Sequence, residues 1–200
     1  MERLPKTATI EDLQQRIALY EDMKAYEELY YLCFDGLHRF SFSFVKSNEV
    51  AEEIVSDVFL KIWQLRGRLA EIENLRVYLY TIAKNFSLNY IQRSYKNPAL
   101  HIDDMDIEAS IEFTSPEELL ISAEMLKTIR LVILQLPPQC RLIFQLVKED
   151  GLKYKEVASI LDLSVLTVRN QLAIAVRKIG TALPDFFPLN PLVRKDFAKD

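Results

Sequence analysis

The sequence predicts an all-α protein built from two small helical domains. Three observations predict this class: apolar residues recur at helical spacing along most of the chain, the alternation that marks strands is scarce, and the 200 residues include only four glycines. Half of the residues are hydrophobic, so a chain of this length can form a core in each of two domains.

Two helices are expected at the start of the chain. Thr9 and Asp12 are typical of a capped helix start, and the short helix that follows is interrupted at Glu21-Asp22. The next helix is longer and has one apolar face, made of Tyr26, Leu29, Tyr30, Cys33, Leu37, Phe40 and Phe44. We assign residues 1–22 to an N-terminal extension and residues 23–96 to the first domain.

Residues 48–65 form the clearest helix of this half. Its inward residues keep helical spacing: Ala51, Ile54, Val55, Val58, Phe59 and Ile62. The opposite face carries Glu53, Asp57, Leu60 and Gln64 in one row. A leucine between acidic residues indicates a surface for a partner. A solvated face with one exposed leucine is the alternative interpretation.

A loop with Gly67 is expected over residues 64–74, followed by a helix over residues 75–95. The inward residues of that helix are Leu75, Leu79, Ile82, Phe86 and Tyr90. Its other face carries Arg76, Tyr80, Lys84, Asn85, Asn89 and Arg93. Interleaved aromatic, amide and basic groups suit single-stranded nucleic acid, because bases stack on rings and phosphates meet cations. A mixed solvated face explains the same spacing equally well.

Charge is divided unevenly along the chain, whose net formal charge is −4. Residues 1–96 carry −1, residues 97–126 carry −8 and residues 127–200 carry +5. Residues 97–114 have little periodicity, so we predict an acidic linker there. A basic C-terminal part suits a polyanionic partner, whereas the acidic segment should lie off the nucleic acid or imitate it.

The second domain is expected over residues 115–183. Ser115-Pro116-Glu117-Glu118 has the serine, proline and glutamate of a helix start, and this helix should run to about Leu136. Another helix is expected from Gln139 to Asp150, closed by Gly151. Residues 184–200 form a tail with three prolines, which either docks through Phe186 and Phe187 or is mobile.

Residues 152–179 read as two short amphipathic helices joined by a three-residue turn. Asp162 in the turn tolerates left-handed dihedral angles, and Ser164 can cap the second helix. This is the plan of a helix-turn-helix, whose second helix enters the major groove of DNA. Leu166 stands where a polar side chain would reach the DNA. The candidate duplex contacts are Ser164, Thr167, Arg169, Asn170, Gln171, Arg177 and Lys178, with Arg169, Asn170 and Gln171 as base readers.

Several functional classes find no support in the sequence. Cys33 and Cys140 lie in apolar helical patterns, which favours buried thiols in a reducing cytoplasm over a disulfide or a metal pair. His38 and His101 lack ligand partners at metal spacing, and neither a phosphate loop nor a nucleophile elbow occurs. We therefore expect no catalytic residues, no cofactor and no metal. No signal peptide or membrane span is visible, so membrane insertion is not expected.

Three blocks resemble bacterial extracytoplasmic-function (ECF) sigma factors. They are AEEIVSDVFLKIW (residues 51–63), LRVYLYTIAKNFSLNYIQR (75–93) and LPPQCRLIFQLVKEDGLKYKEVASILDLSVLTVRNQLAIAVRKI (136–179). The resemblance covers roughly residues 10–182 in order and spacing, and the YTIAKNFSLNYI stretch is closest to the branch common in Bacteroidetes.

The resemblance implies a cytoplasmic, non-enzymatic initiation subunit with sigma region 2 at residues 23–96 and sigma region 4 at residues 115–183. It implies that the row from Glu53 to Gln64 binds core RNA polymerase, and that residues 64–93 hold the melted minus-10 element. The helix-turn-helix would read the minus-35 element as duplex, and an anti-sigma factor would be a further partner.

The chain departs from the family at three places. Leu166 stands where lysine or arginine is common, Asn89 replaces a common aspartate, and QRSYK (residues 92–96) is poor in basic residues. A stand-alone helix-turn-helix regulator, with N-terminal helices for dimerisation or sensing, is the alternative. It leaves the blocks at residues 51–93 unexplained.

Overall fold

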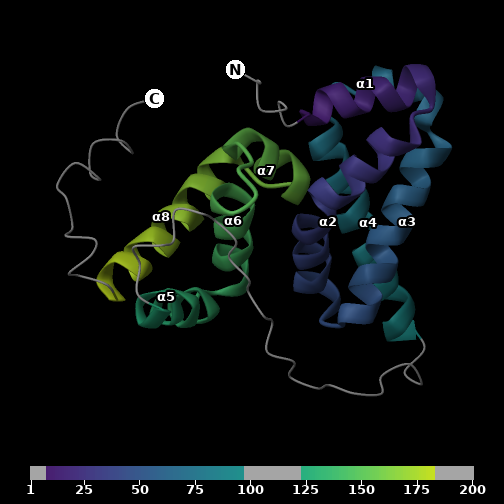
Figure 1. Ribbon diagram of the computed structural model, residues 1–200. Coiled ribbons are helices and arrows are strands. Elements are labelled where there is room, and N and C mark those ends of the chain that lie inside the picture. Colours follow the sequence, from purple (N-terminus) through teal and green to yellow (C-terminus); the bar gives the residue numbers. More distant parts are fainter. Residues whose placement is uncertain (1–7, 97–122, 183–200) are drawn as a thin grey trace, which may run out of the picture. The chain divides into compact units, whose positions relative to one another are not determined.

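The computed structural model describes residues 8–96 and 123–182, and every regular element within them is a helix (Figure 1). The all-α class is confirmed. The chain divides into two compact units, the first with the N-terminal helices and the second with most of the C-terminal ones. The predicted linker at 97–114, the helix start at Ser115 and the tail at 184–200 lie outside the described residues.

The first unit contains α1 (Ile10–Tyr20), α2 (Met23–Val45), α3 (Asn48–Gln64), the short 3-10 helix η1 (Arg66–Glu71) and α4 (Leu75–Lys96). Helix α2 packs against both α3 and α4, and α1 packs against η1 and α2. The largest fully buried side chains of this unit are Leu13, Ile17, Leu29, Leu37, Phe59, Ile62, Leu69, Leu75 and Leu79. Helix α1 therefore shares the core of this unit, although residues 1–22 read as an extension from the sequence.

The break between α1 and α2 is built as the sequence predicts. Thr9 and Asp12 form a reciprocal capping box at the start of α1. Glu21 ends α1 in the left-handed region with φ of 49°. The Asp22 carboxylate then caps α2 by accepting from the backbone N–H groups of Lys24 and Ala25. These caps satisfy backbone groups that the two helix ends would otherwise leave without partners.

The predicted loop over residues 64–74 is wrong in one respect, because it contains η1. The side chain of Leu69 is fully buried, and the Gln14 amide nitrogen on α1 donates to the carbonyl oxygens of Leu69 (2.6 Å) and Ile72 (2.8 Å). Gly67 interrupts the helical pattern but does not prevent a tight turn of 3-10 helix. The partners that hold η1 come from a distant segment, so local periodicity does not reveal them.

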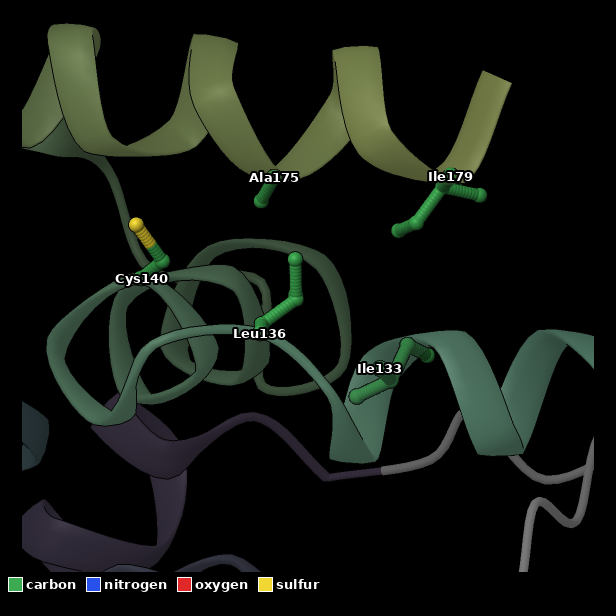
Figure 2. Packing of buried hydrophobic residues seen from close by; sticks show 5 residues of the cluster. All are labelled: Ile133, Leu136, Cys140, Ala175 and Ile179. Atoms are coloured by element: carbon green, nitrogen blue, oxygen red, sulfur yellow. The ribbon is translucent and has the colours of Figure 1, made fainter. Parts of the chain in front are cut away.

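The second unit contains α5 (Ala123–Leu134), α6 (Pro138–Lys148), α7 (Tyr154–Leu161) as far as Ala158, and α8 (Val165–Ala182). Figure 2 shows how α8 lies over α5 and α6, with Ala175 and Ile179 directed toward Leu136, Cys140 and Ile133. Ile129, Val132 and Phe144 pack around this cluster. The cluster fixes the inner face of α8 and so determines which of its residues face outward.

Helix α6 begins one residue before and ends two residues before the predicted helix from Gln139 to Asp150. Pro138 opens the helix, where its missing N–H costs no hydrogen bond. Gly151 adopts a positive φ of 66°, and the Leu152 N–H reaches back to the Leu146 carbonyl at 2.9 Å. A glycine tolerates this backbone conformation without steric cost, and it reverses the chain toward α7.

Helices α7 and α8 form the predicted helix-turn-helix. They are bent by 108°, within the roughly 90–120° of this motif. Asp162 has the expected positive φ of 54°, and the Ser164 hydroxyl accepts from the Thr167 N–H at 2.9 Å. In the described part of the chain no single helix is long and apolar enough to cross a membrane; only α7 and α8 taken together across their bend reach that length and composition.

Candidate nucleic-acid and protein interfaces

The outer row of α3 is exposed along its length. Glu53, Asp57, Leu60 and Gln64 are all exposed, and Leu60 keeps 55% of its surface accessible. Their spacing of four, three and four residues keeps them on one side of an α-helix. The predicted shared face is confirmed, and what binds to it is a separate question.

Contacts on the inner side of α3 hold this row in a fixed direction. The Tyr26 hydroxyl on α2 donates to the Phe59 carbonyl at 2.9 Å. The Tyr26 ring packs edge-on against Phe59 and Trp63, with ring centroids 5.9 and 5.1 Å apart. Burial raises the pKa of Tyr26, so the phenol stays protonated and keeps donating. Helix α3 is thus tied to α2 next to Leu60.

Helix α4 carries the predicted single-strand face with two corrections. The Lys84 side chain is only 8% exposed, so the prediction that it contacts the single strand is wrong. Asn85, Asn89 and Arg93 are exposed, and Arg76 is half-buried. These residues offer amides and cations over several turns of α4. Hydrogen bonds to bases and contacts to phosphates are therefore available along this side.

Tyr80 is the second correction on α4. Its ring is only 4% exposed and packs edge-on against Phe40 on α2, with centroids 5.2 Å apart. A buried ring cannot offer its face to a base, so the prediction of Tyr80 as a stacking platform is wrong. Small residues explain the difference: Ala83 and Ser87 are buried on the neighbouring turns and widen the inward face beyond the predicted apolar row.

Sequence reasoning missed the organisation of η1, which joins α3 to α4. The Arg66 guanidinium lies 4.9 Å from the centre of the Trp63 ring and forms an ion pair of 3.2 Å with Glu21. Arg68 is exposed and pairs with Glu71 at 3.0 Å. The Asn74 side chain caps α4 by accepting from the Val77 N–H at 3.0 Å. The Arg-Gly-Arg run at 66–68 was the available signal.

Helix α8 presents an outward row that differs from the predicted base-reading set. Leu166 is 66% exposed, Asn170 is exposed and Ile174 is 39% exposed, at intervals of four residues. Arg177 and Lys178 continue this side as exposed cations. Arg169 is half-buried beside the row, and Ser164 and Thr167 bond to each other through their hydroxyls at 2.8 Å. Asn170 is therefore the most accessible of the three base readers.

Gln171 is the correction on α8. The Cys140 thiol on α6 donates to its side-chain oxygen at 2.6 Å. Burial raises the pKa of this thiol, although the charge of Lys178 lowers it, so the group remains a protonated donor at neutral pH. Reading adenine in a bidentate manner needs both the oxygen and the nitrogen of the amide. Because its oxygen is engaged inside the unit, the base-reading prediction for Gln171 is wrong.

No group of three acidic, histidine or cysteine residues within 8–96 and 123–182 is arranged to hold a metal ion. Cys33 and Cys140 are both buried, and neither forms a disulfide. In the described residues, exposed polar and charged side chains gather on three faces, on α3, on η1 with α4, and on α8.

A helix-turn-helix in one unit, together with a second helical unit that exposes amides and cations on α4, is typical of a DNA-binding transcription factor. Comparison with known families matches residues 32–96 to sigma-70 region 2 and residues 126–179 to sigma-70 region 4. The chain belongs to the sigma-70 family of RNA polymerase sigma factors, in its extracytoplasmic-function group. It directs promoter-specific transcription initiation, and it is not a stand-alone regulator. Sigma factors are initiation factors rather than enzymes.

Two curated relatives each match this chain over 159 residues. The ECF RNA polymerase sigma-E factor of Escherichia coli K12 is 28% identical over 159 residues, covering 76% of this chain and 80% of that protein. The RNA polymerase sigma-H factor of Pseudomonas aeruginosa is 27% identical over 159 residues, covering 76% and 79%. The proposed affinity to the Bacteroidetes branch stays a prediction.

Two solved structures share the fold. One is the sigma factor RpoE in complex with the anti-sigma factor NepR from Bartonella quintana, with a TM-score of 0.55, 20% identity and coverage of 80% of this chain and 97% of that one. The other is CnrH in complex with the cytosolic domain of CnrY, with a TM-score of 0.51, 19% identity and coverage of 86% and 96%.

Proposed function

We propose that each of the three exposed faces binds one component of the initiation complex. One observation carries this assignment: each unit that matches a sigma region directs a row of polar and apolar side chains away from its core. The α3 row binds core RNA polymerase, η1 with α4 binds the melted minus-10 strand, and α8 reads the minus-35 duplex. The first unit acts as region 2 over residues 23–96, and the second acts as region 4 over residues 115–183, with residues 97–114 between them.

The polymerase interface centres on Leu60. Its exposed surface becomes buried on binding, and Asp57 and Glu53 on the same row supply negative charge for a basic partner surface. By the family resemblance, the partner is the pair of clamp helices in the largest polymerase subunit. Because α3 is tied to α2 through Tyr26, the row is presented without rearrangement.

The minus-10 interface uses amides and cations instead of the Tyr80 ring. Asn85 and Asn89 can bond to the edges of unpaired bases, and Arg93 can meet phosphates. Arg76, which is half-buried, adds positive charge to the same helix. Without the tyrosine, affinity for the single strand rests on hydrogen bonds and charge, and it should fall steeply as salt rises.

The minus-35 interface follows the outward row of α8. Asn170 suits bidentate recognition of adenine, and Leu166 suits contact with a thymine methyl group. Arg177 and Lys178 reach phosphates, and Arg169, Ser164 and Thr167 flank the row. Two weak DNA modules on one chain bind strongly together once polymerase holds both, because the second contact becomes intramolecular.

An anti-sigma factor is a further proposed partner. Two fold neighbours were solved with partners, the sigma factor RpoE with the anti-sigma factor NepR, and CnrH with the cytosolic domain of CnrY. Such a partner would act in the cytoplasm by covering the polymerase face or the DNA faces. Co-purification of the native chain from cells tests this: recovery without a third protein under every growth condition would count against it.

The function is tested by run-off transcription with sigma-free core polymerase, this chain and a pool of promoter fragments. Start-specific transcripts that require the chain, together with binding to core, are the expected result. Specific duplex binding by the chain alone, without binding to core, would overturn the assignment of the α3 row.

A further inference from the structure

Helix α1 holds η1 through a buried amide. Gln14 is 7% exposed and lies between the buried Leu13 and Ile17 on the inner side of α1. Its nitrogen donates to the carbonyl oxygens of Leu69 at 2.6 Å and Ile72 at 2.8 Å. A buried amide has to find such partners, since leaving a polar group without one inside a protein is costly. Both available N–H groups of Gln14 are therefore directed to the backbone of η1 and the residue that follows it.

A second contact ties the other end of η1 to the same helix. Glu21, the residue that ends α1, pairs with Arg66 at 3.2 Å. Arg66 is itself held over the Trp63 ring and donates to the Trp63 carbonyl at 3.1 Å. Between these two contacts the Leu69 side chain is fully buried. The start, middle and end of η1 are thus fixed, and α1 supplies the partner at both ends.

The outer side of η1 faces away from these contacts. Gly67, Arg68, Ala70 and Glu71 are exposed, and they lie between the last residue of the α3 row and the first turn of α4. A backbone segment in this place meets promoter DNA in the proposed function. Its conformation depends on α1, because a 3-10 turn of six residues has few hydrogen bonds of its own.

We propose that Gln14 is a positioning residue for selection of the minus-10 element. It acts through η1: by holding the Leu69 and Ile72 carbonyls it sets the backbone conformation that η1 presents to the unpaired strand. Residues 8–22 therefore belong to the machinery of promoter choice, although they contact no DNA in this scheme. The inference rests on the proposed function of η1 and α4.

Gln14→Leu tests the proposal, because leucine is similar in size and removes both hydrogen bonds. Gln15→Leu is the matched control, since Gln15 is the exposed neighbour on the same helix. Each variant is assayed by run-off transcription on promoters that differ at single minus-10 positions, and separately on promoters that differ in the minus-35 element. Core affinity and a thermal melt are measured on the same preparations.

In the wild type, a well-read base is preferred by about fivefold or more. With Gln14→Leu this preference at the minus-10 element should fall to about twofold or less, while minus-35 preference and core affinity stay unchanged. Gln15→Leu should behave as wild type. A uniform loss of transcription with the preference intact would show a merely structural role and overturn the proposal, as would an unchanged preference.

A second variant decides the matter if Gln14→Leu does not melt cooperatively. Glu21→Asn removes the pairing with Arg66, and asparagine tolerates the left-handed backbone at this position. Reduced minus-10 preference in this variant supports the control of η1 by α1, and wild-type preference overturns it. If the wild type itself shows no minus-10 preference or does not bind core, the proposed function fails instead, so the two failures are distinguishable.

Discussion

Leu60→Ala should weaken binding to core RNA polymerase without destabilising the protein. Leu60 is 55% exposed in the free chain, so about half of its surface remains to be buried by a partner. Complete burial of a leucine contributes roughly 1.5–3 kcal/mol. Leu60 can bury about half of its surface on binding, and alanine keeps part of that contribution, so the substitution should cost about 1 kcal/mol of binding free energy. Such a loss corresponds to a rise of about fivefold in the dissociation constant.

The assay is fluorescence anisotropy of the labelled chain titrated with core polymerase. Leu19→Ala is the matched control, because Leu19 on α1 is 66% exposed and lies outside the proposed polymerase face. Both variants should melt at or slightly above the wild-type temperature, since alanine is a good helix former and neither leucine is buried. Equal core affinity for Leu60→Ala and the wild type would refute the assignment of the α3 row. So would an equal loss for Leu19→Ala.

Three further predictions follow from the same faces and from the helix caps. Asp57→Arg should weaken core binding by about tenfold or more through charge reversal, with an unchanged melt; normal core affinity would contradict a basic partner surface. If Leu166 contacts a thymine methyl, replacing that minus-35 thymine by deoxyuridine removes one buried carbon, which contributes ~0.8 kcal/mol. Transcription by the wild type should then fall by about fourfold. Leu166→Ala should be insensitive to that replacement, and equal sensitivity of the two proteins would remove Leu166 from the interface. The backbone N–H of Ala25 and the Arg16 guanidinium lower the pKa of Asp22 in the folded protein. The carboxylate charge therefore stabilises the fold at pH values above the ordinary aspartate pKa. This stabilisation is lost as the pH falls through the lowered pKa of the folded state. Asp22→Asn should therefore melt below wild type at pH 7, with a gap that closes below about pH 4; a gap that stays constant down to pH 3 would exclude the charge as its cause.

Most of the helices could be predicted from the sequence because their signals are local. Thr9 with Asp12, and Ser164, mark helix starts by the hydrogen bonds that their side chains make within a few residues. The exposed row on α3 was also predictable, because one helix with a continuous apolar side has only one opposite side.

The site residues that were misassigned depend on neighbouring helices. Tyr80 is buried because Phe40 on α2 meets it, and Gln171 turns inward because Cys140 on α6 donates to it. Helical periodicity predicts the direction of a side chain only to within about a third of a turn. For a residue at the edge of a face, the neighbouring helix therefore determines whether the side chain is buried or exposed. Leu166 and Asn170 form the outward row of α8 because the opposite side of this helix packs against α5 and α6.

The sequence by itself determined the class of the protein, because three blocks in the order of the family, a helix-turn-helix and a basic C-terminal part together indicate a sigma factor. Only the tertiary structure decided how η1 is held and which polar residues are accessible. Gln14 shows the physical reason. Its partners are the carbonyls of Leu69 and Ile72, 55 and 58 residues away along the chain. Every residue has a backbone carbonyl, so the sequence does not indicate which ones accept from Gln14. A contact of this kind exists only once the helices have packed.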